Sequence, residues 1–234
     1  MLISHKYRFI FIHIFKTAGT SVMDVFLPYS RLIDRMAYEY KYSRKLFGII
    51  VHLMGWHDDG MKQFTGFHTH AKAYEIKETL GSSIFDSYYK FTFVRNPFDF
   101  LVSLYFYISQ DKNHRHHSMV NNMSFLEFLR WHIANNPPHQ LDFVTELHSC
   151  KRLVDYIGRF ETLEKDITII QERLGLKIRS SINHKNPSFK RKSKDYKGYY
   201  DDEGKMLVEN YFQTDLDLFG YDFDGFNENM TIMQ

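Results

Sequence analysis

The chain has few of the residues that mark specialised classes of protein. It contains one cysteine (Cys150), five prolines and two tryptophans among 234 residues. A single cysteine excludes an intrachain disulfide and a cysteine-based metal site, and it suits a reducing compartment such as the cytoplasm. The formal net charge is only +2, so composition does not favour a partner such as nucleic acid.

Long apolar stretches are missing near the N-terminus. The apolar run Phe9 to Phe15 spans seven residues and is interrupted by His13, so it predicts neither a signal peptide nor a membrane-spanning helix. Hydrophobic residues at 44% and charged residues at 25% are values of an ordinary globular protein. We therefore expect a bacterial-type cytoplasmic protein with one domain over residues 1–234.

Two segments rich in β-branched and aromatic residues, 8–15 and 88–94, predict buried strands. The first leads through residues 16–19 into a helix that ends near Leu27, with Thr20 or Ser21 as the N-cap. The second ends at Arg95, and Pro97 opens a helix to about residue 109. Further helices are predicted at 124–134, 164–174 and 202–213, and a short strand at 156–160. This alternation predicts an α/β fold, a central and mainly parallel sheet flanked by helices, with ligands at the carboxyl ends of the strands.

The segment 16–21, with the sequence KTAGTS, has the parts of an anion-binding loop. It follows a buried strand, it opens a helix, and Lys16 adds a positive charge to the backbone N–H groups. The lysine precedes the glycine, so the spacing is not that of a Walker A loop. A tight turn with a surface lysine is the alternative interpretation.

A second candidate site lies at the end of the second strand. Arg95 stands at the strand end and Ser103 follows about two helical turns later. A guanidinium group and a hydroxyl suit a terminal phosphate. Alternatively, Arg95 forms a structural ion pair and Ser103 lies on an ordinary helix face.

Two further segments carry candidate functional residues. His68 and His70 form a compact H-x-H, and histidine is the side chain best suited to act as a base near neutral pH. A surface loop or part of a metal site are the alternatives, whereas His13 reads as a core histidine. From Lys177 to Lys197 there are eight basic residues and one acid, which predicts a second anion site, a solvated loop or a weak nucleic-acid patch.

Residues 13–21 resemble the 5′-phosphosulfate loop of sulfotransferases that use 3′-phosphoadenosine-5′-phosphosulfate (PAPS), and above all the carbohydrate sulfotransferases of sulfotransferase family 2. The resemblance implies a P-loop-like nucleotide-binding fold. It also implies that Lys16 contacts the leaving 5′-phosphate and the transferring group. Phosphate contacts are implied for the rest of the loop, which comprises Thr17, Ala18, Gly19, Thr20 and Ser21.

Three other segments extend the resemblance. Residues 95–103 resemble the 3′-phosphate motif R-x-P-x-x-R-x-x-S, although Phe100 stands where relatives often have a second arginine. Residues 184–192 resemble a late basic loop that closes over the nucleotide. The H-x-H resembles that of uronyl and hexuronic acid 2-O-sulfotransferases, which implies that His70 is the base and His68 its helper. The implied residues of the late loop are Ser188, Lys190 and Arg191.

The expected function is therefore transfer of a sulfuryl group from PAPS to a hydroxyl acceptor, best matched by a carbohydrate, with 3′-phosphoadenosine-5′-phosphate (PAP) as the product. No metal, nucleic-acid partner or membrane span is expected. One alternative is an ATP-dependent P-loop-type kinase, which usually needs an acidic metal ligand where Arg95 stands. The other is a noncatalytic protein that binds nucleotides or anionic glycans.

Overall fold

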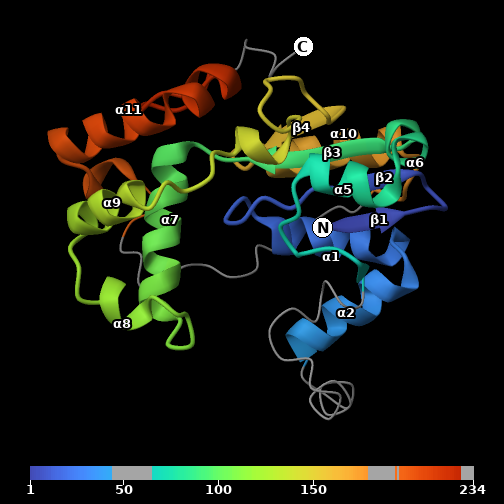
Figure 1. Cartoon of the computed structure of the whole chain (residues 1–234), viewed down its shortest axis with the longest axis horizontal. Helices are drawn as coiled ribbons and strands as arrows, with labels where there is room; N and C mark the ends of the chain where they lie inside the picture. The colour runs from blue at the N-terminus through green and yellow to red at the C-terminus, as the bar shows by residue number, and fades with distance from the viewer. Residues whose placement is uncertain (44–64, 179–192, 194, 228–234) are drawn as a thin grey trace. The chain divides into compact units, whose positions relative to one another are not determined.

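The structure, a computed structural model, describes residues 1–43, 65–178, 193 and 195–227 (Figure 1). Two compact units divide the chain. The first combines Met1–Phe93 with Asp142–Asn183, and the second combines Val94–Leu141 with His184–Gln234.

The sheet has four strands in the order β1-β2-β3-β4. β2 (Phe9–Phe11) pairs in parallel with β3 (Tyr89–Val94), and β4 (Tyr156–Arg159) follows β3 in the sheet. β1 (Leu2–Ser4) pairs antiparallel with β2 at the other side. The predicted α/β fold is confirmed. The sequence did not predict β1, and β2 covers only part of the first half of the predicted strand at 8–15.

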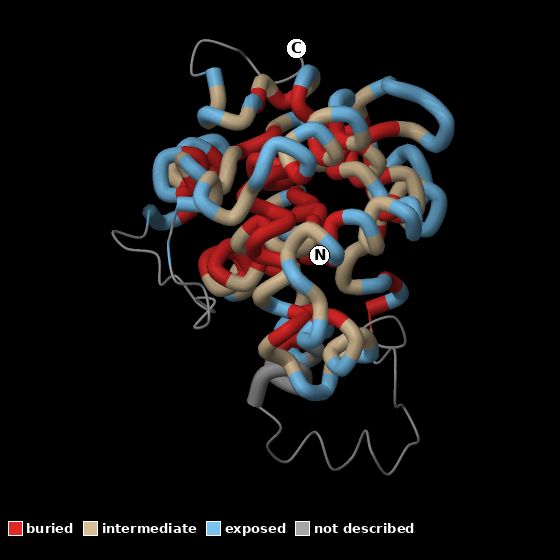
Figure 2. The backbone as a smooth tube through the Cα atoms, turned by 90° about the vertical axis from the view of Figure 1, so that its left-hand side faces the viewer, coloured by how far each residue is buried: buried red, intermediate tan, exposed pale blue. Residues whose placement is uncertain are grey.

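Phenylalanine side chains make the core on one face of the sheet. Alternating residues of β2 and β3, which comprise Phe9, Phe11, Phe91 and Phe93, are all fully buried. They pack with apolar residues of α1 (Gly19–Phe26) and α10 (Leu163–Arg173). These strands lie among the buried backbone segments, which are red in Figure 2.

The helix α6 (Ser82–Ser87) lies on the other face of the sheet. Lys90, which alternates with the phenylalanines of β3, donates from Nζ to the Phe85 carbonyl at 3.4 Å. α5 (Ala73–Leu80) packs against α6. Among the described residues, this unit also contains the α-helix α2 (Leu32–Ser43). The strands are therefore flanked by helices on both faces.

Where the second unit is described, it contains four α-helices: α7 (Pro97–Gln110), α8 (His117–Val120), α9 (Phe125–Ala134) and α11 (Asp202–Phe219). α7, α9 and α11 pack against one another. The predicted start of α9 is confirmed, since Ser124 and Glu127 form a capping box. α11 continues beyond the predicted end at Gln213, but Phe212 has non-helical φ and ψ there. In the described parts of the chain, no helix is long and apolar enough to cross a membrane.

Gly158 of β4 lets two elements approach closely. A Cβ at this position would lie 2.6 Å from Cε1 of Phe93 and 3.0 Å from Cβ of Asp166. We predict that Gly158→Ala lowers the free energy of unfolding by about 1–3 kcal/mol, because the buried phenylalanine must move. Urea unfolding measures the loss. Gly198→Ala is the control, since no atom lies within 4 Å of its Cβ, and an equal loss in both variants would refute the close-packing argument.

Candidate functional site

The loop between β2 and α1 has an unusual backbone. Lys16 and Ala18 both have φ of 61°, in the left-handed region that residues other than glycine seldom adopt. Such conformations cost on the order of 1–3 kcal/mol each and are concentrated at functional sites. Turns that contain left-handed residues direct successive N–H groups to one point, where they form anion-binding concavities.

The N-terminus of α1 has no side-chain cap. Ala18 occupies the N-cap position and has no oxygen in its side chain, so the predicted cap at Thr20 or Ser21 is wrong. The amides of Ser21 and Val22 donate to the Ala18 carbonyl at 2.9 and 3.1 Å. Within the described residues, no hydrogen bond uses the amides of Gly19 and Thr20. These two donors, at the positive end of a helix, are available to an anion.

The side chains of the loop have different surroundings. Lys16, Ala18 and Thr20 are half-buried, whereas Thr17 and Ser21 are 1% and 2% exposed. The Thr17 hydroxyl donates to the Ile14 carbonyl at 2.9 Å and so braces the loop from inside. Backbone amides and the lysine are therefore the main groups that this loop can offer to a phosphate.

His70 lies beside this loop. Its Nδ1 is 2.8 Å from the carbonyl oxygen of His13, three residues before Lys16. Its ring is 4.5 Å from the ring of His13 and meets the Phe15 ring edge-on at 5.9 Å. A carbonyl oxygen only accepts hydrogen bonds, so we assign the proton of the neutral ring to Nδ1 and the lone pair to Nε2.

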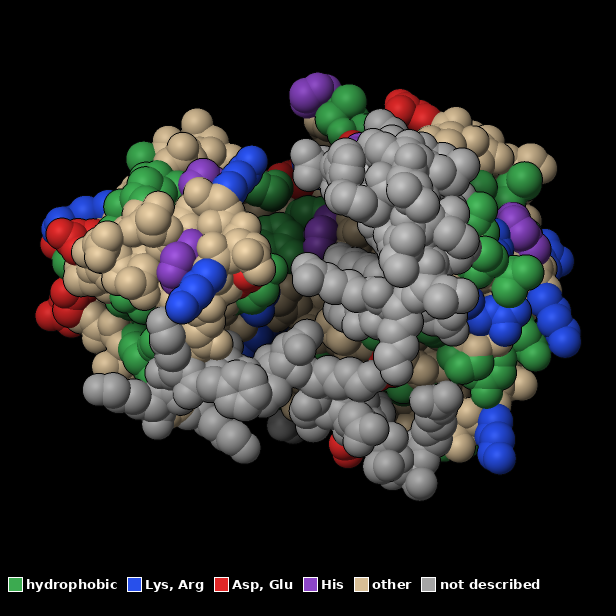
Figure 3. Space-filling model, turned by 90° about the horizontal axis from the view of Figure 1, so that it is seen from below, with side chains coloured by type: hydrophobic (Ala, Val, Ile, Leu, Met, Phe, Trp, Pro, Cys, Tyr) green, Lys and Arg blue, Asp and Glu red, His purple; other side chains and the backbone are tan. Residues whose placement is uncertain are grey.

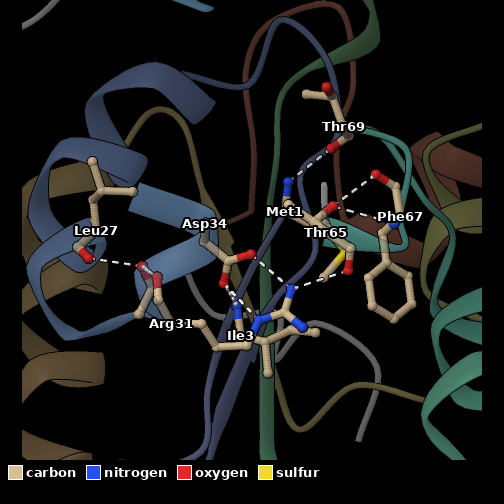
Figure 4. A network of polar contacts seen from close by, with 9 residues as sticks. Met1, Ile3, Leu27, Arg31, Asp34, Thr65, Phe67 and Thr69 are labelled. Atoms are coloured by element: carbon tan, nitrogen blue, oxygen red, sulfur yellow. Dashed lines mark hydrogen bonds and ion pairs between the residues drawn. The ribbon is translucent and has the colours of Figure 1, made fainter. Parts of the chain in front are cut away.

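His68 is exposed, in contrast to the half-buried His70. The segment that carries both histidines is held by backbone contacts (Figure 4). The Met1 nitrogen donates to the Thr69 carbonyl at 2.8 Å. The hydroxyl of Thr65 donates to the Phe67 carbonyl at 3.0 Å and accepts from the Phe67 amide at 3.2 Å. The H-x-H therefore starts from a fixed turn.

A partly buried ion pair supports the same turn (Figure 4). Arg31 donates to both carboxylate oxygens of Asp34, at 2.7 and 3.0 Å, and from Nη2 to the Thr65 carbonyl at 3.4 Å. Asp34 is 2% exposed and also accepts from the amide of Ile3 in β1 at 3.1 Å. The ion pair thus joins β1, α2 and the segment that leads to His70.

Arg95 follows directly after β3 and is 6% exposed. Its Nε and Nη2 lie 2.8 and 2.6 Å from Oδ2 of Asp99, one turn into α7. Asn96 caps α7 by accepting from the Phe98 amide at 3.0 Å, and Pro97 occupies the first turn as predicted. The ion pair of the alternative interpretation therefore exists, and it fixes the guanidinium group at the helix N-terminus. Ser103 lies further along α7 and is 5% exposed.

Comparison with known proteins identifies the chain. The sulfotransferase family matches residues 1–222, which is nearly the whole chain. The chain belongs to the sulfotransferase family. It is also similar to an uncharacterised protein of Archaeoglobus fulgidus, with 34% identity over 105 residues, which is 44% of this chain and 82% of that protein. No solved structure gives a significant match.

Two features of this sulfotransferase bear on the implied phosphate residues. Phe100, where the 3′-phosphate motif of relatives often carries a second arginine, is only 4% exposed and belongs to the core. The late basic loop, with Ser188, Lys190 and Arg191, lies outside the described residues. Of the residues implied to contact the 3′-phosphate, Arg95 and Ser103 lie within the described residues.

A second histidine cluster lies around α8. His116 contacts His114 at 5.7 Å and Trp131 at 5.1 Å between ring centroids. Burial, and then the charge of His116, lower the pKa of His114 below its ordinary value. Figure 3 shows histidine side chains next to basic ones on the left-hand part of one face. Among the described residues, no group of three or more histidines, cysteines and acids is arranged to hold a metal ion.

The sequence did not reveal the residues that hold Arg95 in place. The side chain of Gln140 accepts from the Arg95 amide at 2.9 Å and donates to its carbonyl at 2.8 Å. Asp215, fully buried in α11, accepts from the amides of Gln140 and Leu141 at 2.8 and 3.0 Å. No motif marks these residues, which lie 45 and 120 positions after Arg95 in the sequence.

We predict that Gln140→Leu lowers the free energy of unfolding by about 2–4 kcal/mol. The substitution keeps the volume but removes the Gln140 hydrogen bonds to the buried N–H and C=O of Arg95, at about 1–3 kcal/mol each. Urea unfolding measures the change. The control is Gln213→Leu, because Gln213 is exposed on α11. A loss no larger than that of the control would contradict a clamp on Arg95.

Proposed function

We propose that the protein transfers a sulfuryl group from PAPS to a hydroxyl group of a carbohydrate. The observation that carries the proposal is the position of His70, which lies against the strand end from which the anion-binding loop starts. A loop alone supports anion binding, whereas a loop with a fixed base beside it supports a transfer reaction. The resemblance of the H-x-H to uronic acid 2-O-sulfotransferases supports a saccharide acceptor.

The donor loop fits the 5′-phosphosulfate group. Its left-handed residues, the amides of Gly19 and Thr20 and the positive end of α1 are donors of the kind that phosphate oxygens accept. Lys16 supplies the positive charge next to them, with Thr17, Ala18 and Ser21 completing the loop. In this proposal Lys16 stabilises the negative charge that develops on the 5′-phosphate.

Arg95 and Ser103 bind the 3′-phosphate in the same proposal. Asp99 holds the guanidinium plane of Arg95, and Gln140 holds its backbone, so little side-chain freedom is lost when a phosphate binds. The motifs follow β2 and β3, which are neighbouring parallel strands. Ser188, Lys190 and Arg191 complete the phosphate contacts, as the resemblance implies.

His70 is the proposed general base. When bound, PAPS supplies an activated sulfuryl group that is linked to its 5′-phosphate through an oxygen atom. Nε2 of His70 takes the proton of the acceptor hydroxyl, while Nδ1 keeps its own proton in the hydrogen bond to the His13 carbonyl. That hydrogen bond fixes the ring plane and the tautomer. His68, two residues earlier and exposed, is proposed as a helper toward the acceptor.

We also propose that both compact units belong to one sulfotransferase domain, because the family match extends over residues 1–222 and so includes parts of both. The proposal also places the protein in the cytoplasm, where a chain with one cysteine needs no oxidising environment. The first acid after β3, Asp99, is ion-paired with Arg95, which disfavours its use as the metal ligand of a kinase.

The donor is tested by isothermal calorimetry with PAP and with ATP plus Mg²⁺. We expect PAP to bind at least about tenfold more tightly, because Arg95 and Ser103 serve a 3′-phosphate that ATP lacks. Lys16→Ala should weaken PAP binding by about 10- to 100-fold, the worth of a charge-assisted hydrogen bond. Equal or reversed preference would overturn the donor and favour the kinase reading.

The base is tested by replacing the two histidines separately. We expect His70→Ala to lower kcat by about 10²- to 10⁴-fold, the usual contribution of a positioned base, with unchanged PAP affinity. His68→Ala is the matched control and should lower kcat by less than about tenfold. Turnover of labelled PAPS on a glycan panel measures both. Full activity of His70→Ala would remove it from the mechanism, and PAP binding without turnover of any acceptor would favour a noncatalytic binding protein.

A further inference from the structure

His13 occupies a special position at the end of β2. It is 6% exposed, and its ring stacks on Phe11 at 5.7 Å with an interplanar angle of 22°. Phe11 belongs to the phenylalanine core on the face covered by α1 and α10. The His13 imidazole therefore continues the packed aromatic rings of the core, such as Phe11, toward the donor loop.

The same ring also meets the start of α1. A Cβ built on Gly19 would lie 1.7 Å from Nε2 and 2.0 Å from Cδ2 of His13. Gly19 is not among the residues with positive φ, so its backbone conformation does not demand glycine. Glycine is needed here because the imidazole fills the space that any side chain would take. The Cα of Gly19 thus packs directly against the His13 ring.

The same residue contacts the proposed base. The His13 carbonyl accepts from Nδ1 of His70 at 2.8 Å, and the two rings lie 4.5 Å apart at an interplanar angle of 54°. The carbonyl fixes the tautomer of His70, while the ring forms one wall against which His70 packs. The edge of Phe15 supplies a further contact at 5.9 Å.

We propose that His13 is a positioning residue that couples the donor loop to the base. Its ring lies in contact with both Gly19 and His70, so a displacement of the α1 N-terminus by a bound anion is passed to the base through rigid packing. In this proposal His13 acts through Gly19 and His70 and not on the donor or the acceptor. This inference rests on the proposed function for its catalytic consequence, but the packing path exists without a ligand.

The packing path is tested first without nucleotide. In protein with ¹⁵N-labelled histidine, Gly19→Ala should shift the ring signals of His70 and weaken its Nδ1–H tautomer, because the added Cβ displaces the His13 ring. Ile170→Val, which removes one methyl group from the same core, is the control and should leave these signals in place. Unchanged His70 signals in Gly19→Ala would overturn the coupling, whatever the protein binds.

The second arm uses PAP. In the unmodified chain, PAP should shift the His70 ring signals, and in His13→Ala this shift should be lost while PAP still binds. His13→Ala should also lower kcat by about 10- to 100-fold, the effect of a misplaced catalytic group, with KM for PAPS changed far less. An unchanged PAP-induced shift or an unchanged kcat in a folded His13→Ala variant would refute the proposal.

The two experiments distinguish a failure of the sulfotransferase assignment from a failure of the coupling through His13. If PAP does not bind the unmodified chain, the donor assignment fails, while the nucleotide-free comparison of Gly19→Ala with Ile170→Val still decides the packing path. If PAP binds and turnover occurs but His70 does not respond to Gly19→Ala, the coupling fails and the sulfotransferase assignment stands.

Discussion

The buried carbonyl groups just beyond β2 are the constraint on which the candidate site depends. The strand register with β3 ends at Phe11, and the Ile12 amide still donates to the Phe91 carbonyl at 2.9 Å. The next two carbonyls are satisfied by side chains. The carbonyl of Ile12 accepts from the hydroxyl of Thr92 at 2.7 Å, and the carbonyl of His13 accepts from His70 at 2.8 Å. Leaving a buried carbonyl without a hydrogen-bond donor costs more free energy than one such hydrogen bond contributes on balance. The need to satisfy the His13 carbonyl therefore favours a histidine next to the donor loop.

Local features of the site could be predicted from the sequence. The glycine-containing loop after a buried apolar segment, the helix opened by Pro97 and the capping box at Ser124 depend on residues within one or two turns of each other. The N-cap of α1 was predicted wrongly for an informative reason. Capping rules assume that a side chain satisfies the first turn of a helix, whereas Ala18 at the N-cap has no side-chain acceptor to do so.

Long-range contacts could not be predicted. His70 reaches a carbonyl 57 residues earlier, and Gln140 clamps a backbone 45 residues earlier. Neither contact leaves a periodic or local pattern, because any donor of suitable length could serve. The edge strand β1 was also missed, since its three residues are too few to show the alternation by which strands are identified. The sequence therefore indicates the candidate site residues, whereas the contacts that hold them in position are known only from the fold.

The ion pair of Arg95 with Asp99 has a consequence for how an anion is attracted. A guanidinium group with a carboxylate at 2.6 Å has no net charge, and its field falls off more steeply than that of a lone arginine. Solvent ions already screen exposed charges beyond about 8 Å at physiological ionic strength. As the proposed 3′-phosphate site, this motif therefore contributes little to long-range steering, and its selectivity depends on the direction of its N–H groups at contact distance. Added salt should affect the rate of capture through other basic groups, such as Lys16, far more than through Arg95.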